Sequence, residues 1–273
     1  MSGLWDNAWR KSQHNKEREN ERITKNKKLF NPNYELKNNK VIYPIKFKFN
    51  KNFIWILLEK NKGGGIIIYD IETNQVYNLS KENGKLNTNN VNDIDVDNLG
   101  NVWIATDEGL IYYSSSNFDD NFTYIIPNDG EKFLFKNIKI TSLKITYSNH
   151  VLLGTEDGLI IFDNLNNSIV YQFNNLNSPL IEDFIKSISI NEKGVSYILT
   201  SGGLMSLRTA STKPKDDYSK IKIYPNPIKL KEHDRLFFER LMDNNSVKIV
   251  SLNGEKVLET KVYGGGFTWN LMN

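Results

Sequence analysis

The chain has 273 residues, of which 39% are hydrophobic and 12% aromatic, and its formal net charge is +3 at pH 7. This composition indicates a folded protein long enough for one large or two ordinary domains, and it excludes an intrinsically disordered chain. There is no cysteine, which excludes disulfide bonds and a thiol nucleophile, and no stretch approaches the roughly 18 consecutive apolar residues of a membrane-spanning helix.

The first 40 residues are predicted to form a polar, charged lead-in. Residues 1–28 carry eight basic and four acidic side chains, so this segment holds more than the whole net positive charge of the chain. Residues 16–22 mix both signs without an apolar stripe, which favours a solvated helix or flexible arm over a nucleic-acid-binding one. The segment has no apolar core and is therefore not a secretory signal peptide; we expect an export signal upstream.

A strand-turn-strand phrase recurs along the chain. Its copies cover residues 91–111, 140–162 and 185–204, and a looser copy covers residues 45–70. In one copy, an alternating strand at Val91–Val96 precedes a strand at Val102–Ala105 that is apolar on both faces. The Gly-Leu pairs of the three copies lie 49 and 45 residues apart. A period of this size with short strands is typical of β-propeller blades.

We therefore predict an all-β chain. Residues 41–208 are expected to hold about four blades of a partial propeller, arranged as an open arc. Residues 209–218 contain small, charged and proline residues and are predicted to be a linker. Residues 219–273 are predicted to form a small, incomplete antiparallel sandwich, with Asn253-Gly254 as a hairpin turn. Its expected strands are residues 221–224, 235–239, 246–250 and 256–260.

The copies share a set of characteristic residues. Large side chains stand at corresponding places and are predicted to wedge between blades rather than to bind a ligand: Trp55, Trp103, Leu152 and Tyr197. The glycines of the Gly-Leu pairs are expected at tight turns that require a positive φ. The blade motif consists of Trp55, Trp103, Thr106, Gly109, Thr155, Gly158 and Gly203.

No catalytic, metal-binding or cofactor-binding constellation is predicted. The histidines have no common spacing and are assigned to the surface of the arm, a turn and a loop: His14, His150 and His233. The alternating carboxylates of Asp93, Asp95 and Asp97 lack the glycine and glutamate of a calcium loop, so we expect them to share the solvent face of a strand. The glycine runs at residues 63–65 and 264–266 are predicted as turns, not phosphate loops.

The last module resembles the C-terminal sorting domain of the Bacteroidetes type IX secretion system. The residues that carry this resemblance are Tyr224, Pro225, Asn226, Pro227, Asn253, Gly254 and Trp269. The blade phrase is similar to the propeller repeats named after two-component regulators. In this order, over residues 41–273, the two motifs together resemble the PorZ-like family of surface components of that secretion system.

The resemblance implies a non-enzymatic, exported protein on the outer-membrane surface, with two propellers and a sandwich. It also implies a role in presenting anionic lipopolysaccharide to the sortase-like partner PorU. The family has more blades, and its sandwich continues where this chain stops, so we expect the chain to be a fragment. Two alternatives remain open: a secreted propeller cargo protein with a cleavable sorting domain, and the sensor propeller of a hybrid two-component regulator.

Overall fold

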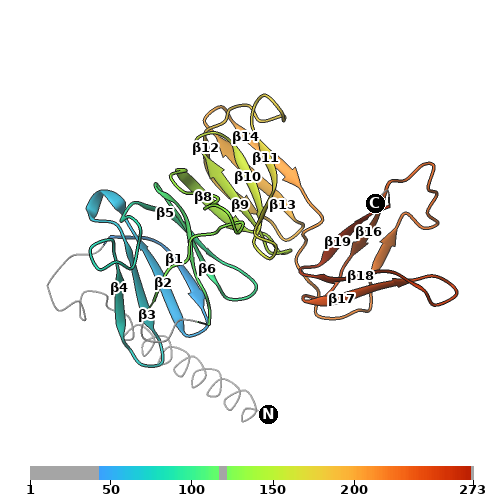
Figure 1. Ribbon diagram of the computed structural model, residues 1–273, viewed down its shortest axis with the longest axis horizontal. Coiled ribbons are helices and arrows are strands. Elements are labelled where there is room, and N and C mark those ends of the chain that lie inside the picture. The colour runs from blue at the N-terminus through green and yellow to red at the C-terminus, as the bar shows by residue number, and fades with distance from the viewer. Residues whose placement is uncertain (1–42, 117–121, 272–273) are drawn as a thin grey trace, which may run out of the picture. The chain divides into compact units, whose positions relative to one another are not determined.

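The computed structural model describes residues 43–116 and 122–271 of the chain (Figure 1). The predicted lead-in at residues 1–40, which includes His14, lies outside the described residues. In the described part, the regular elements are β-strands, apart from one short 3-10 turn, η1 (Lys60–Lys62). The predicted all-β class is therefore confirmed. Within the same ranges, no helix is long and apolar enough to cross a membrane.

The first two blades are antiparallel sheets built from consecutive strands. The first blade contains β1 (Pro44–Asn50), β2 (Phe53–Leu58), β3 (Ile66–Asp70) and β4 (Val76–Leu79). The second blade contains β5 (Val91–Val96), β6 (Val102–Thr106) and β7 (Gly109–Tyr113). Ile125 forms an isolated bridge to Tyr112 of β7. The bridge lies at the outer edge of the second blade, which corresponds to the edge that β4 occupies in the first blade.

The third and fourth blades repeat this order. The third blade contains β8 (Ile140–Ile145), β9 (His150–Thr155), β10 (Leu159–Asp163) and β11 (Ser168–Phe173). The fourth blade contains β12 (Ile185–Ile190), β13 (Val195–Thr200) and β14 (Leu204–Arg208). The predicted partial propeller of about four blades is therefore confirmed. The repeated phrase did not indicate β4 and β11, the fourth strands of the first and third blades.

Hydrophobic clusters fill the spaces between successive blades. Trp55 packs with Ile94 of the second blade, Trp103 with Leu143 of the third, and Leu152 with residues of the fourth. The side chains of Trp55, Trp103 and Leu152 are 0%, 2% and 0% exposed. Tyr197 occupies the same register position in the fourth blade but is 41% exposed. The three buried residues therefore act as spacers between blades, whereas Tyr197 lies on an uncovered blade face.

A threonine and a glycine define the turn after the second strand of each later blade. Thr106 Oγ1 donates to the carbonyl of Gly109 at 2.8 Å, and Thr155 Oγ1 donates to that of Gly158 at 2.8 Å. Gly109 and Gly158 have φ angles of 125° and 121°. A Cβ on Gly158 would lie 2.0 Å from the carbonyl oxygen of Phe173. The turn therefore needs glycine both for its backbone angle and for the close approach of a backbone carbonyl, here that of the last residue of β11.

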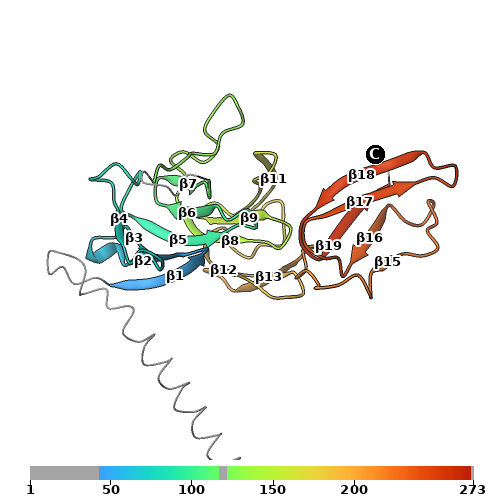
Figure 2. The same ribbon diagram turned by 90° about the horizontal axis from the view of Figure 1, so that it is seen from below.

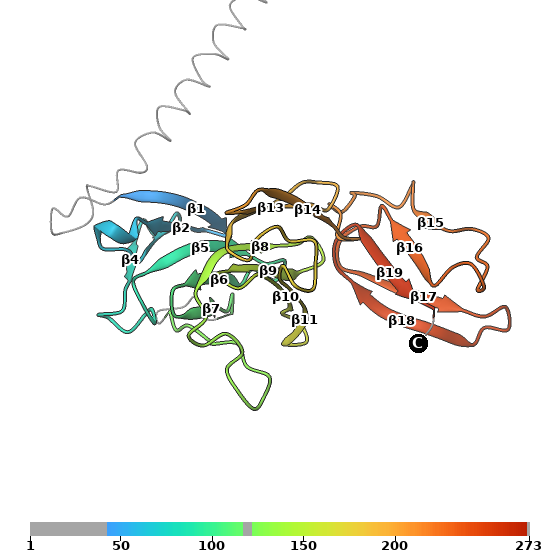
Figure 3. The ribbon, with the colours of Figure 1, turned by 90° about the horizontal axis from the view of Figure 1, so that it is seen from above.

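The second module consists of two small antiparallel sheets (Figure 3). One sheet contains β15 (Lys222–Tyr224), β16 (Arg235–Glu239) and β19 (Gly266–Asn270). The other contains β17 (Asn245–Val250) and β18 (Lys256–Val262). Phe238, Leu241 and Val262 form the core between the sheets, with partly buried residues of both sheets around them. The predicted small sandwich is therefore confirmed, and β16 has the predicted bounds.

The glycine run 264–266 does more than form a turn. Gly266 already belongs to β19, and the N–H of Gly265 donates to the carbonyl of Thr212 at 2.7 Å. A Cβ on Gly264 would lie 2.6 Å from the carbonyl oxygen of Tyr147, and one on Gly266 would lie 2.0 Å from that of Ala210. The three glycines are needed because the backbone of the second module lies directly against the backbone of residues 147 and 210–213.

Candidate functional site

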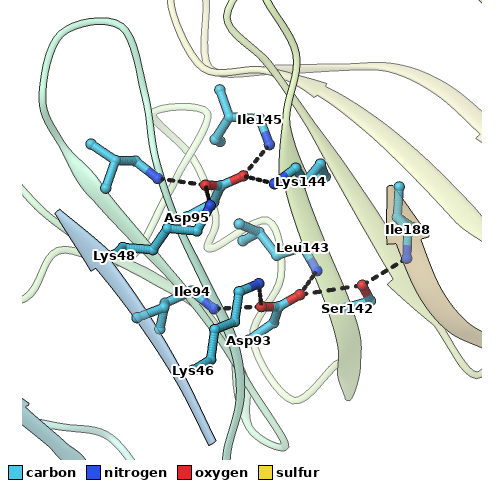
Figure 4. A network of polar contacts seen from close by, with 11 residues as sticks. Lys46, Lys48, Asp93, Ile94, Asp95, Ser142, Leu143, Lys144, Ile145 and Ile188 are labelled. Atoms are coloured by element: carbon cyan, nitrogen blue, oxygen red, sulfur yellow. Dashed lines mark hydrogen bonds and ion pairs between the residues drawn. The ribbon is translucent and has the colours of Figure 1, made fainter. Parts of the chain in front are cut away.

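The first strands of the four blades, β1, β5, β8 and β12, are neighbours in chain order (Figure 2). Register pairing with the second strand of each blade identifies equivalent positions on them. Lys46, Asp93, Ser142 and Ser187 share one position, and Lys48, Asp95, Lys144 and Ser189 share another. Polar side chains at these two positions form the candidate site (Figure 4).

The prediction that Asp93, Asp95 and Asp97 share a solvent face is wrong. Their exposed fractions are 7%, 5% and 5%. The alternation of β5 places Asp93 and Asp95 on one face, as predicted, but that face lies against the first strand of the next blade. A buried carboxylate must be paired or fully hydrogen-bonded, and the neighbouring strands provide these partners.

Asp93 connects three blades. Its Oδ1 accepts the N–H of Ile94 at 2.8 Å and forms an ion pair with the ammonium group of Lys46 of the first blade. Its Oδ2 accepts the N–H of Leu143 at 2.9 Å and the hydroxyl of Ser142 at 3.3 Å, both from the third blade. The hydroxyl oxygen of Ser142 in turn accepts the N–H of Ile188 on the fourth blade at 3.0 Å. A continuous polar chain therefore runs across all four first strands (Figure 4).

Asp95 makes a second connection one position further along. Its Oδ1 lies 2.6 Å from Nζ of Lys48 and accepts the N–H of Val96 at 3.1 Å. Its Oδ2 lies 3.3 Å from Nζ of Lys144 and accepts the N–H of Ile145 at 3.0 Å. Burial by itself would raise the pKa of Asp95, but the ammonium groups of Lys144 and Lys48 outweigh burial and hold the pKa below its ordinary value.

The pKa values of the two lysines beside Asp95 are shifted in opposite directions. Burial lowers the pKa of Lys48, but the charge of Asp95 and its hydrogen bond more than compensate, so the pKa lies above its ordinary value. Burial also lowers the pKa of Lys144, and here the attraction of Asp95 only partly compensates, because Lys48 repels the second ammonium. Asp95 therefore holds two cations that would otherwise repel each other.

Asp97 has a different role, at the turn after β5. It accepts the indole N–H of Trp103 at 2.8 Å and the side-chain N–H of Asn164, from the third blade, at 3.0 Å. It also accepts the backbone N–H groups of Leu99 and Asn101, each at 2.9 Å. This carboxylate fixes the turn and orients the tryptophan that separates the second and third blades.

This network, called the inner-strand clamp below, holds neighbouring blades together through buried ion pairs and hydrogen bonds. Three ammonium groups, of Lys46, Lys48 and Lys144, surround the carboxylates of Asp93 and Asp95, and every carboxylate oxygen has hydrogen-bond donors. Hydrogen bonds to charged groups contribute about 1.5–3 kcal/mol each. The network thus joins consecutive blades at their inner edges, where the backbone N–H groups of Leu143, Ile145 and Ile188 have side-chain acceptors. Of the blade-motif residues, Trp55 pairs with Lys48 and Trp103 with Asp95 in the register of the first and second strands.

The sorting-motif residues lie in the second module and do not converge on one point. Tyr224 ends β15, stacks on Phe237 with ring centroids 5.3 Å apart, and donates its hydroxyl to Glu239 at 2.6 Å. The peptide bonds before Pro225 and Pro227 are both cis, so Asn226 lies between two cis bonds. Trp269 lies on β19 of the same sheet, whereas Asn253 and Gly254 form the turn of the β17–β18 hairpin on the other sheet.

The prediction that His150 lies in a turn is wrong, because it is the first residue of β9; its side chain is 37% exposed. The Nε2 atom of His150 lies 4.0 Å from Asp163. Burial lowers its pKa, and the nearby carboxylate of Asp163 only partly opposes this effect. His233 accepts the N–H of Lys229 at 3.1 Å within a loop of the second module. Among the described residues, no three histidine, cysteine or acidic side chains are grouped as metal ligands would be.

A cleft of about 810 Å³ lies between the third and fourth blades and the second module. Its apolar wall includes Val170, Tyr171 and Phe237, and its charged residues include Arg208 and Arg235. Nothing in the sequence indicated this cleft, because its walls come from elements that are far apart in the chain.

The chain matches no protein-family model, and no curated protein matches it. Among solved structures, it is similar to PorZ of Porphyromonas gingivalis, described as an essential bacterial surface component of the type IX secretion system. The two share 20% identity with a TM-score of 0.55, over 85% of this chain and 34% of PorZ. This chain therefore spans about a third of the length of PorZ, and the similarity supports a propeller-type fold.

Two extracellular domains of Bacteroides thetaiotaomicron regulators are also similar. That of a protein described as a one-component system shares 14% identity, with a TM-score of 0.36, over 80% of this chain and 34% of its own. That of a hybrid two-component system shares 14% identity, with a TM-score of 0.38, over 88% of this chain and 41% of its own. With TM-scores this low, neither adds to the assignment of the fold.

Proposed function

We propose that this chain belongs to a PorZ-like, non-enzymatic component of the type IX secretion machinery at the bacterial cell surface. The observation that carries the proposal is the extent of the likeness to PorZ. It covers 85% of the chain, which is more than the four blades occupy. Blades followed by a C-terminal module are the order expected for such a component.

The sequence of the second module gives independent support. Tyr224 to Pro227, the Asn253-Gly254 turn and Trp269 resemble a type IX sorting domain. In the structure, these residues lie in a small two-sheet module that follows the last blade, which is the place that a sorting domain would take.

The inner-strand network favours a scaffold over a catalyst. Asp93 and Asp95, the two carboxylates of the blades' first strands, are both buried, and each is engaged by lysine and backbone N–H groups from neighbouring blades. These contacts use the charged groups to hold the blades together. A protein of this kind would offer surfaces for partners rather than a reaction centre.

In this role the chain would help to present anionic lipopolysaccharide to the sortase-like PorU, within an attachment complex on the outer-membrane surface. These partners are those that the sequence resemblance implies. The type IX export route would bring the protein to the outer surface of the cell.

The direct test is co-purification. The gene is tagged at its chromosomal locus, the outer membrane is solubilised in mild detergent, and the tagged protein is isolated together with its partners. A stable complex with the sortase-like protein, in which the tagged protein keeps its second module by intact mass, supports a machinery component. A protein that is cleaved between residues 208 and 219 and recovered without the sortase is a secreted cargo, and the proposal fails.

A further inference from the structure

The fourth blade has an open outer edge. In the first and third blades, a fourth strand, β4 or β11, pairs with the third strand. In the second blade, Ile125 and Tyr112 exchange backbone hydrogen bonds of 2.9 and 2.8 Å at the corresponding place. Ser206 of β14 holds the register position of Tyr112. Within residues 43–116 and 122–271, no segment pairs with the outer edge of β14.

The outer strand of the third blade, β11, has an exposed aromatic side chain on the face towards the fourth blade. Tyr77 of β4 and Tyr171 of β11 share one register position on the outer strands of their blades. Tyr77 packs against Phe122, with ring centroids 5.0 Å apart, and Phe122 precedes the segment that bridges to β7. Tyr171 is 56% exposed and Val170 beside it is 40% exposed. An outer strand on the fourth blade would cover Tyr171 as Phe122 covers Tyr77.

The cleft of about 810 Å³ begins at the C-terminal end of β14, beside the place of this strand. Val170 and Tyr171 line it, as does Arg208, the last residue of β14. Arg235 of the second module also lines the cleft; its side chain is 56% exposed, and its Nε lies 3.5 Å from the carboxylate of Asp234. Glu239 also lines the cleft, and its carboxylate accepts the hydroxyl of Tyr224 at 2.6 Å. The cleft thus lies at the C-terminal end of the open strand edge and is lined there by the exposed side chains of Tyr171 and Arg208, with the ion-paired Arg235 on the opposite wall.

We infer that the edge of β14 and this cleft bind an extended, acidic peptide segment of a partner protein by β-strand addition. The peptide runs antiparallel to β14, as β4 and β11 run to the third strands of their blades. Its backbone pairs with the N–H and carbonyl of Ser206, and an apolar side chain covers Tyr171. A carboxylate of the peptide lies near Arg208 and Arg235. Main-chain pairing at an exposed sheet edge is a common mode of peptide recognition, and alternate side chains give it specificity.

The chain itself provides the probe. A synthetic peptide with the sequence of residues 72–80, ETNQVYNLS, contains β4, a native outer strand, together with a glutamate. Its binding to the full chain is measured by fluorescence anisotropy, and backbone protection of β14 by hydrogen exchange. We expect saturable binding and new protection of the Ser206 amide. The same peptide with Tyr77→Pro, which cannot keep the strand pairing, is expected not to bind.

Arg208→Glu and Lys186→Glu form a matched pair of charge reversals in the fourth blade. We expect Arg208→Glu to weaken binding of the peptide about fivefold or more. Lys186→Glu, on β12 and outside the cleft, is expected to leave binding unchanged. Three results would overturn the inference: no binding of the peptide, equal binding of the proline peptide, or binding without protection of Ser206. Protection of Ser206 in the chain alone would also overturn it, since the edge would then be occupied by the chain itself.

Discussion

Asp95→Asn is the substitution that tests the inner-strand clamp most sharply. It keeps the size of the side chain and removes the negative charge that faces Lys48 and Lys144, at a side chain that is 8% exposed. Breaking a fully buried ion pair by removing one partner costs about 3–5 kcal/mol. The two lysine side chains are 25% and 26% exposed, so water solvates part of their charge. We therefore expect the free energy of unfolding at pH 7 to fall by about 2–3 kcal/mol.

The pH dependence of this loss follows from the lowered pKa of Asp95 in the folded chain. A carboxylate with a lowered folded pKa stabilises the fold above its unfolded pKa of about 3.9, and this stabilisation disappears as the pH falls through the folded pKa. The amide that replaces the carboxyl group in the Asp95→Asn variant cannot titrate. The difference between the wild type and Asp95→Asn is therefore expected to be largest at neutral pH and to shrink below about pH 4.

Urea unfolding followed by tryptophan fluorescence measures the difference, because Trp55 and Trp103 are buried between blades. Asp157→Asn, at an exposed position in the turn between β9 and β10, is the matched control and is expected to change stability by less than about 0.5 kcal/mol. A loss for Asp95→Asn no larger than that of the control would refute the clamp. An equal loss at pH 7 and well below pH 4 would refute the role of the carboxylate charge.

Three further outcomes are expected. Gly158→Ala, at a φ of 121° and with a carbonyl oxygen 2.0 Å from the new Cβ, should lower the free energy of unfolding by more than about 2 kcal/mol. The control Gly84→Ala, at a φ of 71° with no atom within 4 Å of the new Cβ, should lower it by about 1 kcal/mol. Equal losses in urea unfolding would contradict the close approach. Trp103→Phe removes the donor 2.8 Å from the buried carboxylate of Asp97 and should cost about 1–3 kcal/mol in the same assay, and a loss near zero would show that the bond is dispensable. His150 should titrate by NMR below the ordinary histidine value of about 6.5, so that stability falls as the pH drops through 6.5 towards the folded pKa, and a folded pKa at or above 6.5 would be inconsistent with its burial.

The fold was largely predictable because the blade pattern is repeated. Apolar strands such as Val102–Ala105, the Gly-Leu turns and the Asn253-Gly254 hairpin are local signals, and they determined the blades and the second module. The outer strands β4 and β11 were missed because they lie at the edge of their sheets. Their alternation is weak, and β11 is partly or fully exposed along its whole length.

The clamp could not be assigned in the same way. Alternation correctly put Asp93 and Asp95 on one face of β5, but it cannot say what lies opposite that face. Alignment of the repeats would have placed lysines of the first blade, Lys46 and Lys48, at the same positions as the two aspartates. Opposite charges at one repeat position are the signal that would have indicated a contact between blades. Tyr197 shows the same limit, because its exposure depends on what packs against that face of the fourth blade, which alternation does not reveal.

The measurement that tests the proposed function most directly is attachment of secreted proteins in cells that lack the full-length gene. Surface and culture-medium fractions of the deletion strain and the complemented strain are probed for proteins with type IX sorting domains. We predict that these proteins appear in the medium, unattached, in the deletion strain and return to the surface on complementation. Normal attachment and processing without the gene would contradict a role in the machinery, and the chain would then be one of its cargo proteins.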